Sequence, residues 1–257
     1  MAAIRFRLIL TAALALAACE AEEQPATVPA AAPASACEQR AFEGAHFTLC
    51  RYDPARHTIV LFTGQRSFEA LEAELGSRTA GLRFAMNAGM YDEAGAPIGL
   101  FVVQGRQRRA INRRPGAGNF HLLPNGVFVV AADGRAAVMT SAAYDPASEP
   151  HWATQSGPML VIDGALHPAI APNGESLNIR NGVGVDAAGI AWFAISDEPV
   201  SFGRFARLFR DSLTCRNALY LDGTVSSLWD RPAGRRDAYS RLGPLVAVFD
   251  RDSRKEE

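Results

Sequence analysis

Length, composition and charge exclude several classes of protein. The chain has 257 residues, of which 48% are hydrophobic and 21% charged, and its formal net charge is −1. Without Arg5 and Arg7 at the start of the chain, the net charge would fall from −1 to −3. A nucleic-acid-binding domain normally carries a basic surface, so we expect no nucleic-acid partner.

The first 18 residues predict export. Arg5 and Arg7 precede an apolar run from Leu8 to Ala18, which is shorter than the roughly 20 residues that span a bilayer. The sequence Leu-Ala-Ala-Cys that ends at Cys19 resembles the bacterial lipobox, so Cys19 is the predicted lipidation site and residues 1–18 the signal peptide. The alternative is an ordinary secretory signal beside a chance cysteine.

The predicted anchor sets the location of the protein. Stable anchoring requires more than one acyl chain, and lipoproteins normally carry several. Position 20 holds Glu20 and not the aspartate that usually retains lipoproteins in the inner membrane. We therefore expect the protein at the outer membrane, facing the periplasm, with membrane contact through the lipid anchor only.

Composition divides the mature chain into a linker, one domain and a tail. Residues 19–36 are mostly Ala, Pro, Glu, Thr and Ser, which predicts a flexible linker. Residues 37–250 suit one folded domain, and residues 251–257 form a charged tail. In an oxidising compartment we expect Cys37 and Cys50 to form a disulfide. Cys215 lies among apolar residues and is predicted to be a buried structural thiol.

Apolar runs separated by turn signals predict strands in the first half of the domain. The expected strands are 58–63, 83–86, 98–103, 121–123 and 127–130. A helix is expected from Ser67 to Gly76, with Ser67 as its cap and Phe68, Leu71 and Leu75 on one face. Asn125-Gly126 predicts a hairpin turn between the last two strands.

The second half continues this pattern. The expected strands are 136–139, 159–162, 165–167, 183–185, 190–195, 217–221 and 245–249, and Asp163-Gly164 and Asp186–Gly189 are expected turns. A second helix is expected from Ser201 to Leu213, with an apolar stripe at Phe202, Phe205, Phe209 and Leu213. Strands dominate and short turns join them, so the predicted fold class is α+β with mostly antiparallel sheet in a single domain.

The motifs of several common enzyme classes are absent from the sequence. There is no nucleophile-elbow motif, P-loop or zinc-protease motif. The five histidines are scattered without the spacing of metal ligands, so no metal or other cofactor is expected. The glycine pattern at Gly182 and Gly184 precedes a turn and a strand, which is the wrong context for dinucleotide binding.

Polar residues interrupt apolar strands in four segments, namely 86–91, 155–158, 180–185 and 220–227. Taken singly, each is more often a turn than a functional site. In this order, Asn-Ala-Gly-Met-Tyr, Gln-Ser-Gly-Pro-Met-Leu-Val, Arg-Asn-Gly-Val-Gly-Val and Leu-Asp-Gly-x-x-Ser-Ser resemble the phosphodiester glycosidase family. This is the family of the lysosomal uncovering enzyme, which removes N-acetylglucosamine from a mannose 6-phosphate diester.

The resemblance covers roughly residues 84–249 and is strongest toward a bacterial branch of exported proteins. Two motifs differ from the family pattern. The loop Asp-Gly-Gly-Gly-Ser is Asp222-Gly223-Thr224-Val225-Ser226 here, and Asn-Gly-Gly-Phe is replaced by residues 87–90. Fewer glycines restrict a loop, so the fold implied by the resemblance transfers more safely than the substrate.

The implied reaction assigns roles to particular residues. Cleavage at the sugar carbon builds positive charge on the ring, so a carboxylate must face it, and Asp222 is the candidate. A cation must hold the phosphate, and Arg180 offers a bidentate guanidinium. Four more side chains are candidates to bind sugar hydroxyls or phosphate oxygens: Asn87, Gln155, Ser226 and Ser227. The expected partner is a carbohydrate or glycosyl phosphodiester.

Three alternatives remain at this point. Arg180 and Asp222 could form an ion pair that only joins two strands. The domain could bind a glycan or phosphopolymer without cleaving it, which the altered loop favours. A phosphodiesterase that cuts the phosphorus–oxygen bond would usually recruit metals, and the sequence shows no ligand cluster.

Overall fold

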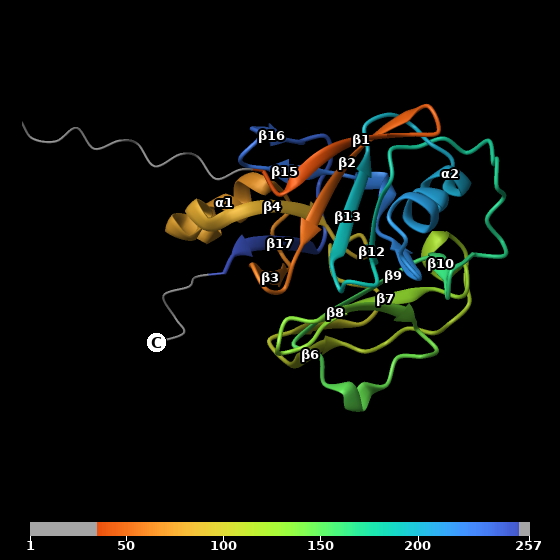
Figure 1. Cartoon of the computed structure of the whole chain (residues 1–257). Helices are drawn as coiled ribbons and strands as arrows, with labels where there is room; N and C mark the ends of the chain where they lie inside the picture. Colours follow the sequence, from red (N-terminus) through yellow and green to blue (C-terminus); the bar gives the residue numbers. More distant parts are fainter. Residues whose placement is uncertain (1–34, 252–257) are drawn as a thin grey trace, which may run out of the picture. The chain divides into compact units, whose positions relative to one another are not determined.

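The computed structural model describes residues 35–251. The predicted signal peptide, Cys19 and nearly all of the linker lie outside these residues, as do residues 252–257 of the tail. The described residues form three sheets whose paired strands are all antiparallel, with two short α-helices (Figure 1). The expected strand-rich, mostly antiparallel architecture is confirmed, although helix is a smaller part than the α+β label implies.

The first sheet has seven strands in the order β1-β2-β13-β12-β14-β10-β11. They are β1 (Cys37–Phe42), β2 (Ala45–Tyr52), β10 (Met159–Ile162), β11 (Ala165–Leu166), β12 (Asn181–Val185), β13 (Ala191–Ser196) and β14 (Asn217–Tyr220). Asp163-Gly164 joins β10 to β11 with positive φ at both residues, and Asp186–Gly189 joins β12 to β13. Both predicted turns are therefore confirmed.

Two five-stranded sheets complete the fold. One has the order β16-β15-β4-β17-β3 and consists of β3 (His57–Phe62), β4 (Leu82–Asn87), β15 (Leu228–Asp230), β16 (Arg235–Arg236) and β17 (Leu245–Asp250). The other has the order β6-β5-β9-β7-β8 and consists of β5 (Phe101–Val103), β6 (Arg106–Arg109), β7 (Gly126–Val130), β8 (Ala136–Thr140) and β9 (Trp152–Ser156).

The three sheets meet around one aromatic cluster. Phe193 on β13 packs against Phe84 on β4 and Phe128 on β7, with ring centroids 5.5 and 5.4 Å apart. All three rings are fully or almost fully buried. Because each ring comes from a different sheet, their burial holds the three sheets to a common core.

The first helix forms as its sequence predicts. Helix α1 (Phe68–Leu75) begins after Ser67, whose hydroxyl accepts a hydrogen bond from the Ala70 N–H, and it ends at Gly76 with φ 53°. The apolar face Phe68, Leu71 and Leu75 is buried. The Ser67 cap and the spacing of the apolar residues therefore both stabilise this helix.

The second helix is shorter than expected. Helix α2 (Phe202–Arg207) passes into a π-helical turn at Leu208–Ser212. Phe209 in this turn lies against β12, where a Cβ placed on Gly184 would lie 2.8 Å from the Phe209 ring and 2.9 Å from the Cys215 sulfur. The glycines that resembled a nucleotide motif thus allow close packing of this helical segment on the sheet.

Other sequence predictions were wrong. Asn125-Gly126 does not form a hairpin: Asn119–His121 is a 3-10 turn, and Asp133-Gly134 forms the turn from β7 to β8. Asn125 is fully buried, because its amide donates to the Phe120 carbonyl at 2.9 Å and accepts from the Ser141 hydroxyl. The strand expected at 98–103 covers only Phe101–Val103, and β1, β2, β6, β9, β15 and β16 were not predicted.

The cysteines behave as expected. Cys37 and Cys50 form a disulfide between directly opposite residues of β1 and β2. Cys215 is a free, buried cysteine, and burial raises the pKa of its thiol to about 12. A thiol that stays protonated at neutral pH is a poor nucleophile, which suits the structural role.

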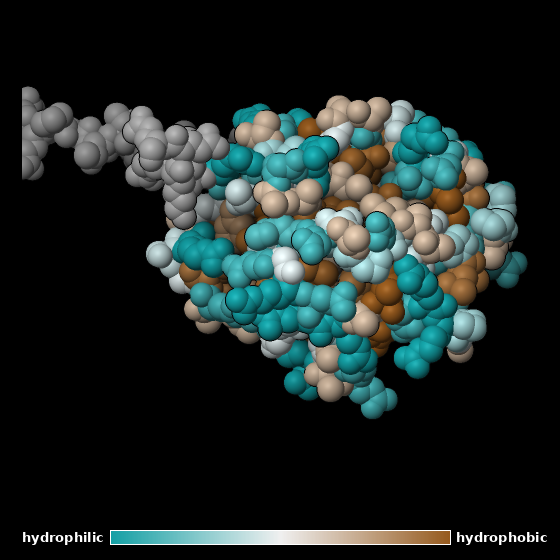
Figure 2. Space-filling view, turned by 90° about the horizontal axis from the view of Figure 1, so that it is seen from below, coloured by the Kyte–Doolittle hydropathy of each residue, from teal (hydrophilic) through white to brown (hydrophobic). Residues whose placement is uncertain are grey.

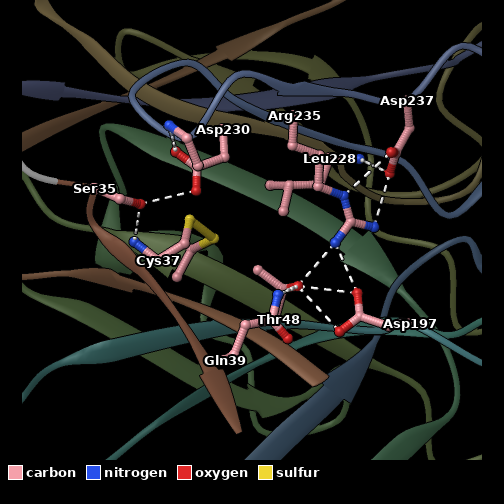
Figure 3. Close-up of a disulfide and its surroundings, with 11 residues drawn as sticks. Ser35, Cys37, Gln39, Thr48, Asp197, Leu228, Asp230, Arg235 and Asp237 are labelled. Carbon is pink, nitrogen blue, oxygen red and sulfur yellow. Dashed lines mark hydrogen bonds and ion pairs between the residues drawn. A yellow bond between two sulfur atoms is a disulfide. The ribbon is translucent and has the colours of Figure 1, made fainter. Parts of the chain in front are cut away.

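Polar contacts around the disulfide tie the start of the domain to its other sheets (Figure 3). The Ser35 hydroxyl donates to Asp230 on β15 at 2.8 Å. Arg235 pairs with Asp197 at 2.7 Å and with Asp237 at 3.1 Å, and it donates to the Thr48 hydroxyl on β2. Within residues 35–251, no helix has both the length and the apolar composition needed to cross a bilayer.

Candidate active site

Two buried asparagines join two of the sheets. Asn87 ends β4 and Asn181 begins β12, and neither side chain is more than 1% exposed. The Asn181 amide donates to both the side-chain and main-chain oxygens of Asn87, at 3.0 Å each. A buried amide must have its hydrogen bonds satisfied, so this pair fixes the distance between the two strand ends.

The segment that carries the predicted catalytic aspartate is held by these asparagines. The Asn87 amide donates to the Asp222 carbonyl at 2.7 Å, and the Asn87 oxygen accepts from the Ser227 N–H at 2.9 Å. The Ser226 hydroxyl lies 3.2 Å from the Asn181 oxygen. The structure therefore brings together four of the predicted site residues: Asn87, Asp222, Ser226 and Ser227.

Asp222 caps a 3-10 turn (Gly223–Val225), and its carboxylate accepts a hydrogen bond from the Thr224 N–H at 3.3 Å. The side chain is half-buried. Burial raises the pKa of Asp222 above its ordinary value of 3.8, and the Thr224 N–H offsets part of that rise. A carboxyl group with a pKa shifted by burial in a partly open site is typical of functional positions.

Tyr91 lies near this carboxylate. Burial and, next, the charge of Asp222 raise the pKa of Tyr91. Its hydroxyl donates to the Arg241 carbonyl at 2.7 Å, and the Arg66 guanidinium lies over its ring, 5.5 Å from the centroid. Tyr91 therefore lies within electrostatic range of Asp222, and Arg66 contacts the ring of Tyr91.

Arg180 is only 1% exposed, although it carries a charge. Its guanidinium donates to the carbonyls of Val200 and Ser176, at 2.8 Å each, and lies 3.6 Å from the centroid of the Phe202 ring. No ion pair between Arg180 and Asp222 occurs in the described part of the chain, so the structural ion pair considered as an alternative is absent. Burial lowers the pKa of Arg180, but an arginine keeps its charge at neutral pH.

Tyr220 connects Arg180 to the aspartate loop. The Arg180 guanidinium donates to the Tyr220 hydroxyl at 3.4 Å, and Gly223 lies against the same oxygen. A Cβ placed on Gly223 would lie 1.5 Å from that hydroxyl, so this position requires glycine. Thr224 and Val225, which replace family glycines, have no positive φ and fit the turn without backbone strain.

Gln155 lies close to the site, but its side chain points elsewhere. Its oxygen accepts from the N–H groups of Leu100 and Asn112, and its nitrogen donates to the Asn112 carbonyl at 2.6 Å. These contacts hold the segments around residues 100 and 112 against β9. Binding of substrate by Gln155 stays a prediction.

Sequence reasoning did not assign roles to Asn181, Tyr220, Tyr91 or Arg66. Asn181 and Tyr220 lie inside the motifs that carry the family resemblance, and a polar residue inside an apolar strand was the available signal. Arg66 is distant in sequence from every motif and gave no signal. Across residues 35–251, no group of His, Cys, Asp and Glu side chains could hold a metal ion.

Comparison with known proteins supports one family. The sequence model of the phosphodiester glycosidase family matches residues 80–240. YigE of Escherichia coli K12, a protein described as uncharacterized, is 40% identical over 163 residues. This match covers 63% of each protein, so the chain spans less than two thirds of the length of this curated relative.

Solved structures show the same fold at low identity. The catalytic domain of zebrafish N-acetylglucosamine-1-phosphodiester alpha-N-acetylglucosaminidase, auto-inhibited by its pro-peptide, has a TM-score of 0.57 at 14% identity, over 84% of this chain and 82% of that one. A hypothetical protein from Synechocystis gives 0.55 at 14% identity, over 84% and 61%. A Burkholderia pseudomallei protein designated as exported gives 0.50 at 16% identity, over 80% and 74%.

Proposed function

Because the chain belongs to the phosphodiester glycosidase family, we propose that it hydrolyses the glycosidic C–O bond of a sugar-1-phosphodiester in an envelope or extracellular glycan. The observation that carries this proposal is the position of Asp222. Its half-buried carboxylate has a raised pKa and accepts one hydrogen bond, from Thr224, among the described residues. One carboxylate oxygen is thus left to face a reacting sugar.

The chemistry matches a carboxylate in this position. The transition state carries positive charge on the sugar ring, which the ionised Asp222 stabilises as nucleophile, base or counter-charge. The phosphate monoester that leaves is a good leaving group, so the reaction has less need of a strong general acid. Asn87 and Asn181 hold the loop, which keeps the carboxylate in place at the moment of reaction.

Arg180 is proposed to hold the phosphate. A guanidinium has five N–H donors, and Arg180 uses three of them for Val200, Ser176 and Tyr220. No carboxylate neutralises this buried charge in the described residues. Ser176 and Phe202, which contact the Arg180 guanidinium, also line a cavity of about 200 Å³.

Export supports a substrate outside the cytoplasm. The Cys37–Cys50 disulfide fits an oxidising compartment, since disulfides rarely persist in the bacterial cytosol. We propose that the chain is a lipoprotein anchored through Cys19, with the glycosidase domain 37–250 facing the periplasm at the outer membrane. Its substrate would then be a glycosyl phosphodiester of the cell envelope.

The test is release of free sugar from synthetic sugar-1-phosphodiesters by the full-length protein, beside Asp222→Asn. Asparagine keeps the shape and the Thr224 contact but removes the charge, so we expect turnover to fall on the order of 10³-fold. Asp163→Asn is the matched control. It changes an exposed turn aspartate, whose positive φ asparagine also tolerates, and it should leave turnover unchanged.

Two outcomes would favour other functions. Binding of the diesters without turnover, across a panel of sugars, would indicate a glycan-binding protein, which the Thr224-Val225 replacement favours. Loss of turnover in the presence of a chelator would indicate a metal-dependent phosphodiesterase. The proposed glycosidase should be insensitive to chelators, because Asp222 and Arg180 supply both charges that the reaction requires.

A further inference from the structure

One strand of the structure carries a row of unpaired arginines. Residues 94–132 contain five arginines and no acidic residue, in a chain of net charge −1. Three of these arginines, Arg106, Arg108 and Arg109, lie on β6, which is the outer strand of its sheet. We call them the basic edge. All three are exposed, and none takes part in an ion pair between described residues.

Several other arginines differ in this respect. Arg207 pairs with Glu43, and Arg236 pairs with Glu69 and Glu72. Arg113, which follows the basic edge, donates to the carbonyls of Ser141 and Tyr144. The basic edge therefore presents positive charge that the protein itself does not neutralise, and such a surface attracts anions.

A cleft runs beside this strand. It has a volume of about 530 Å³, and its lining includes Arg108, Arg78 and Trp152. Glu74 is the single acidic side chain in the lining, and it accepts a hydrogen bond from Gln65. The face seen in Figure 2 is the lower side of Figure 1, where β6 and β8 lie, and it carries a broad band of hydrophilic side chains.

One residue of the cleft is next in sequence to an arginine that contacts Tyr91. Gln65 lines the cleft, and the next residue, Arg66, lies over the ring of Tyr91, whose pKa is raised in part by Asp222. Arg66, like the basic edge, makes no ion pair among the described residues. Residues 65 and 66 therefore connect the cleft with Tyr91.

A second set of contacts connects Arg109 of the basic edge with the proposed active site. In the sheet, Arg109 on β6 lies opposite Phe101 on β5, and Phe101 lies opposite Thr154 on β9. The Thr154 hydroxyl accepts a hydrogen bond from the Gly89 N–H at 3.2 Å. Two strand spacings separate Arg109 from Thr154, which is roughly 10 Å. Gly89 is two residues from Asn87 in the proposed site. The Asp222 N–H donates to the carbonyl of Ala88, the neighbour of Gly89, at 3.3 Å, so this series of contacts ends at the proposed site.

We propose that the basic edge and its cleft bind the continuing chain of a polyanionic substrate, a glycan whose units are joined by phosphodiesters. This inference rests on the proposed function: one linkage lies at Asp222 while phosphates of neighbouring units lie against the arginines. Guanidinium groups bind phosphate through paired hydrogen bonds and charge. A membrane surface fits less well, because the tip of the β5–β6 hairpin, Gln104-Gly105, has no apolar side chain to insert.

The test compares binding of a fluorescent oligomer of glycosyl-1-phosphodiester units to two variants of the full-length protein. One is R106Q/R108Q/R109Q, and the matched control R56Q/R216Q/R231Q removes the same charge from exposed arginines elsewhere. Both also carry Asp222→Asn to prevent cleavage. We expect the first variant to bind about tenfold or more weakly with a reduced dependence on salt, and the control to bind normally.

Turnover separates this inference from the proposed function. With Asp222 intact, R106Q/R108Q/R109Q should lower the ratio of kcat/KM for the oligomer to that for a single-unit diester. Equal oligomer binding by both triple variants would overturn the inference even if diesters are hydrolysed. Loss of binding to anionic phospholipid vesicles, with oligomer binding retained, would also overturn it and indicate a lipid surface. Failure to hydrolyse any diester, with arginine-dependent oligomer binding, would count against the proposed function alone.

Discussion

Asp222 shows how one residue is tuned by its surroundings. Burial removes part of the hydration of its carboxylate, and a single backbone N–H offsets part of that loss. The burial that makes this charge destabilising to the fold also strengthens its interaction with a developing positive charge, because less water screens it. A catalytic carboxylate is thus expected to reduce stability at the pH at which it acts.

The pH dependence of stability tests this view of Asp222. A carboxyl group with a raised folded pKa holds its proton more tightly in the folded state than in the unfolded state. Its contribution to stability is therefore fully present below its ordinary pKa of 3.8 and is lost as the pH rises through the raised value. We expect Asp222→Asn to unfold at a higher temperature than the wild type at neutral pH, with the difference disappearing in acid. Thermal unfolding of both proteins across this pH range checks the prediction. A difference in unfolding temperature that does not change with pH would contradict it.

Tyr220 is predicted to act as a positioning residue through its hydroxyl. Tyr220→Phe keeps the ring against Phe202, 4.6 Å between centroids, but removes the oxygen that contacts Arg180 and Gly223. One lost buried hydrogen bond corresponds to about tenfold in rate if the loop must be held for catalysis. We expect kcat to fall by that factor with KM little changed.

A second tyrosine supplies the control. Tyr52 is also buried and donates to the Gly134 carbonyl at 2.8 Å, in a region without predicted site residues. Tyr52→Phe should cost about 1 kcal/mol of stability and leave kcat unchanged. Equal effects of the two substitutions on kcat would show that Tyr220 has only a structural role.

At the scale of elements, the site depends on where strands from different sheets end. Asn87 closes β4 in one sheet, and Asn181 opens β12 in another. The aspartate loop follows β14, which is paired with β12, so Asp222 is carried to the same place. A site built on strand ends is held more rigidly than one built on long loops, which suits a reaction that needs a fixed carboxylate.

The disulfide stabilises the first hairpin of the domain. It joins residues separated by 13 positions, and β1 has a partner strand on one side only. By the chain-entropy model, such a link contributes about 3 kcal/mol to the free energy of unfolding. Cys37→Ser combined with Cys50→Ala should reduce the free energy of unfolding by about that amount, measured in urea.

The same pair of substitutions should leave the fold intact, since Arg235, Asp197 and Thr48 still hold β2 to the neighbouring elements. Reducing agent should destabilise the wild type and have no effect on the double variant. An unchanged urea midpoint after loss of both cysteines would show that the disulfide adds nothing to the hairpin.

At the scale of the whole molecule, the three sheets place one carboxylate, one buried arginine and a row of exposed arginines on a common framework. Phe193 and its two neighbours form the shared centre of that framework. The fold is shared with solved structures at 14–16% identity, because core burial tolerates many sequences, whereas a site depends on particular residues.

The anchor is a prediction about the whole molecule. If Cys19 is lipidated, the full chain should fractionate with membranes and incorporate labelled palmitate in a bacterial host. Cys19→Ser removes the acceptor and should move the protein to the soluble fraction with turnover of a soluble diester unchanged. Membrane association that persists in this variant without label would contradict a lipid anchor at Cys19.

The sequence by itself determined those features that depend on near neighbours. The cap and apolar face of α1, the turns at Asp163-Gly164 and Asp186–Gly189, and the Cys37–Cys50 pair were all predicted. Each follows from backbone preferences or periodicity within about a dozen residues. The family motifs likewise indicated which polar residues to examine, and four of them lie together.

Only the tertiary structure decided how distant residues combine. Asn87 and Asn181 are 94 positions apart, so no local pattern could show that they bond. Asn125-Gly126 has the composition of a turn, but hydrogen bonds with Phe120 and Ser141 bury the asparagine instead. Arg180 is surrounded by carbonyl oxygens and aromatic rings, not by Asp222. Long-range packing and hydrogen bonding set these outcomes, because a buried polar group takes whichever partners the folded chain brings within reach.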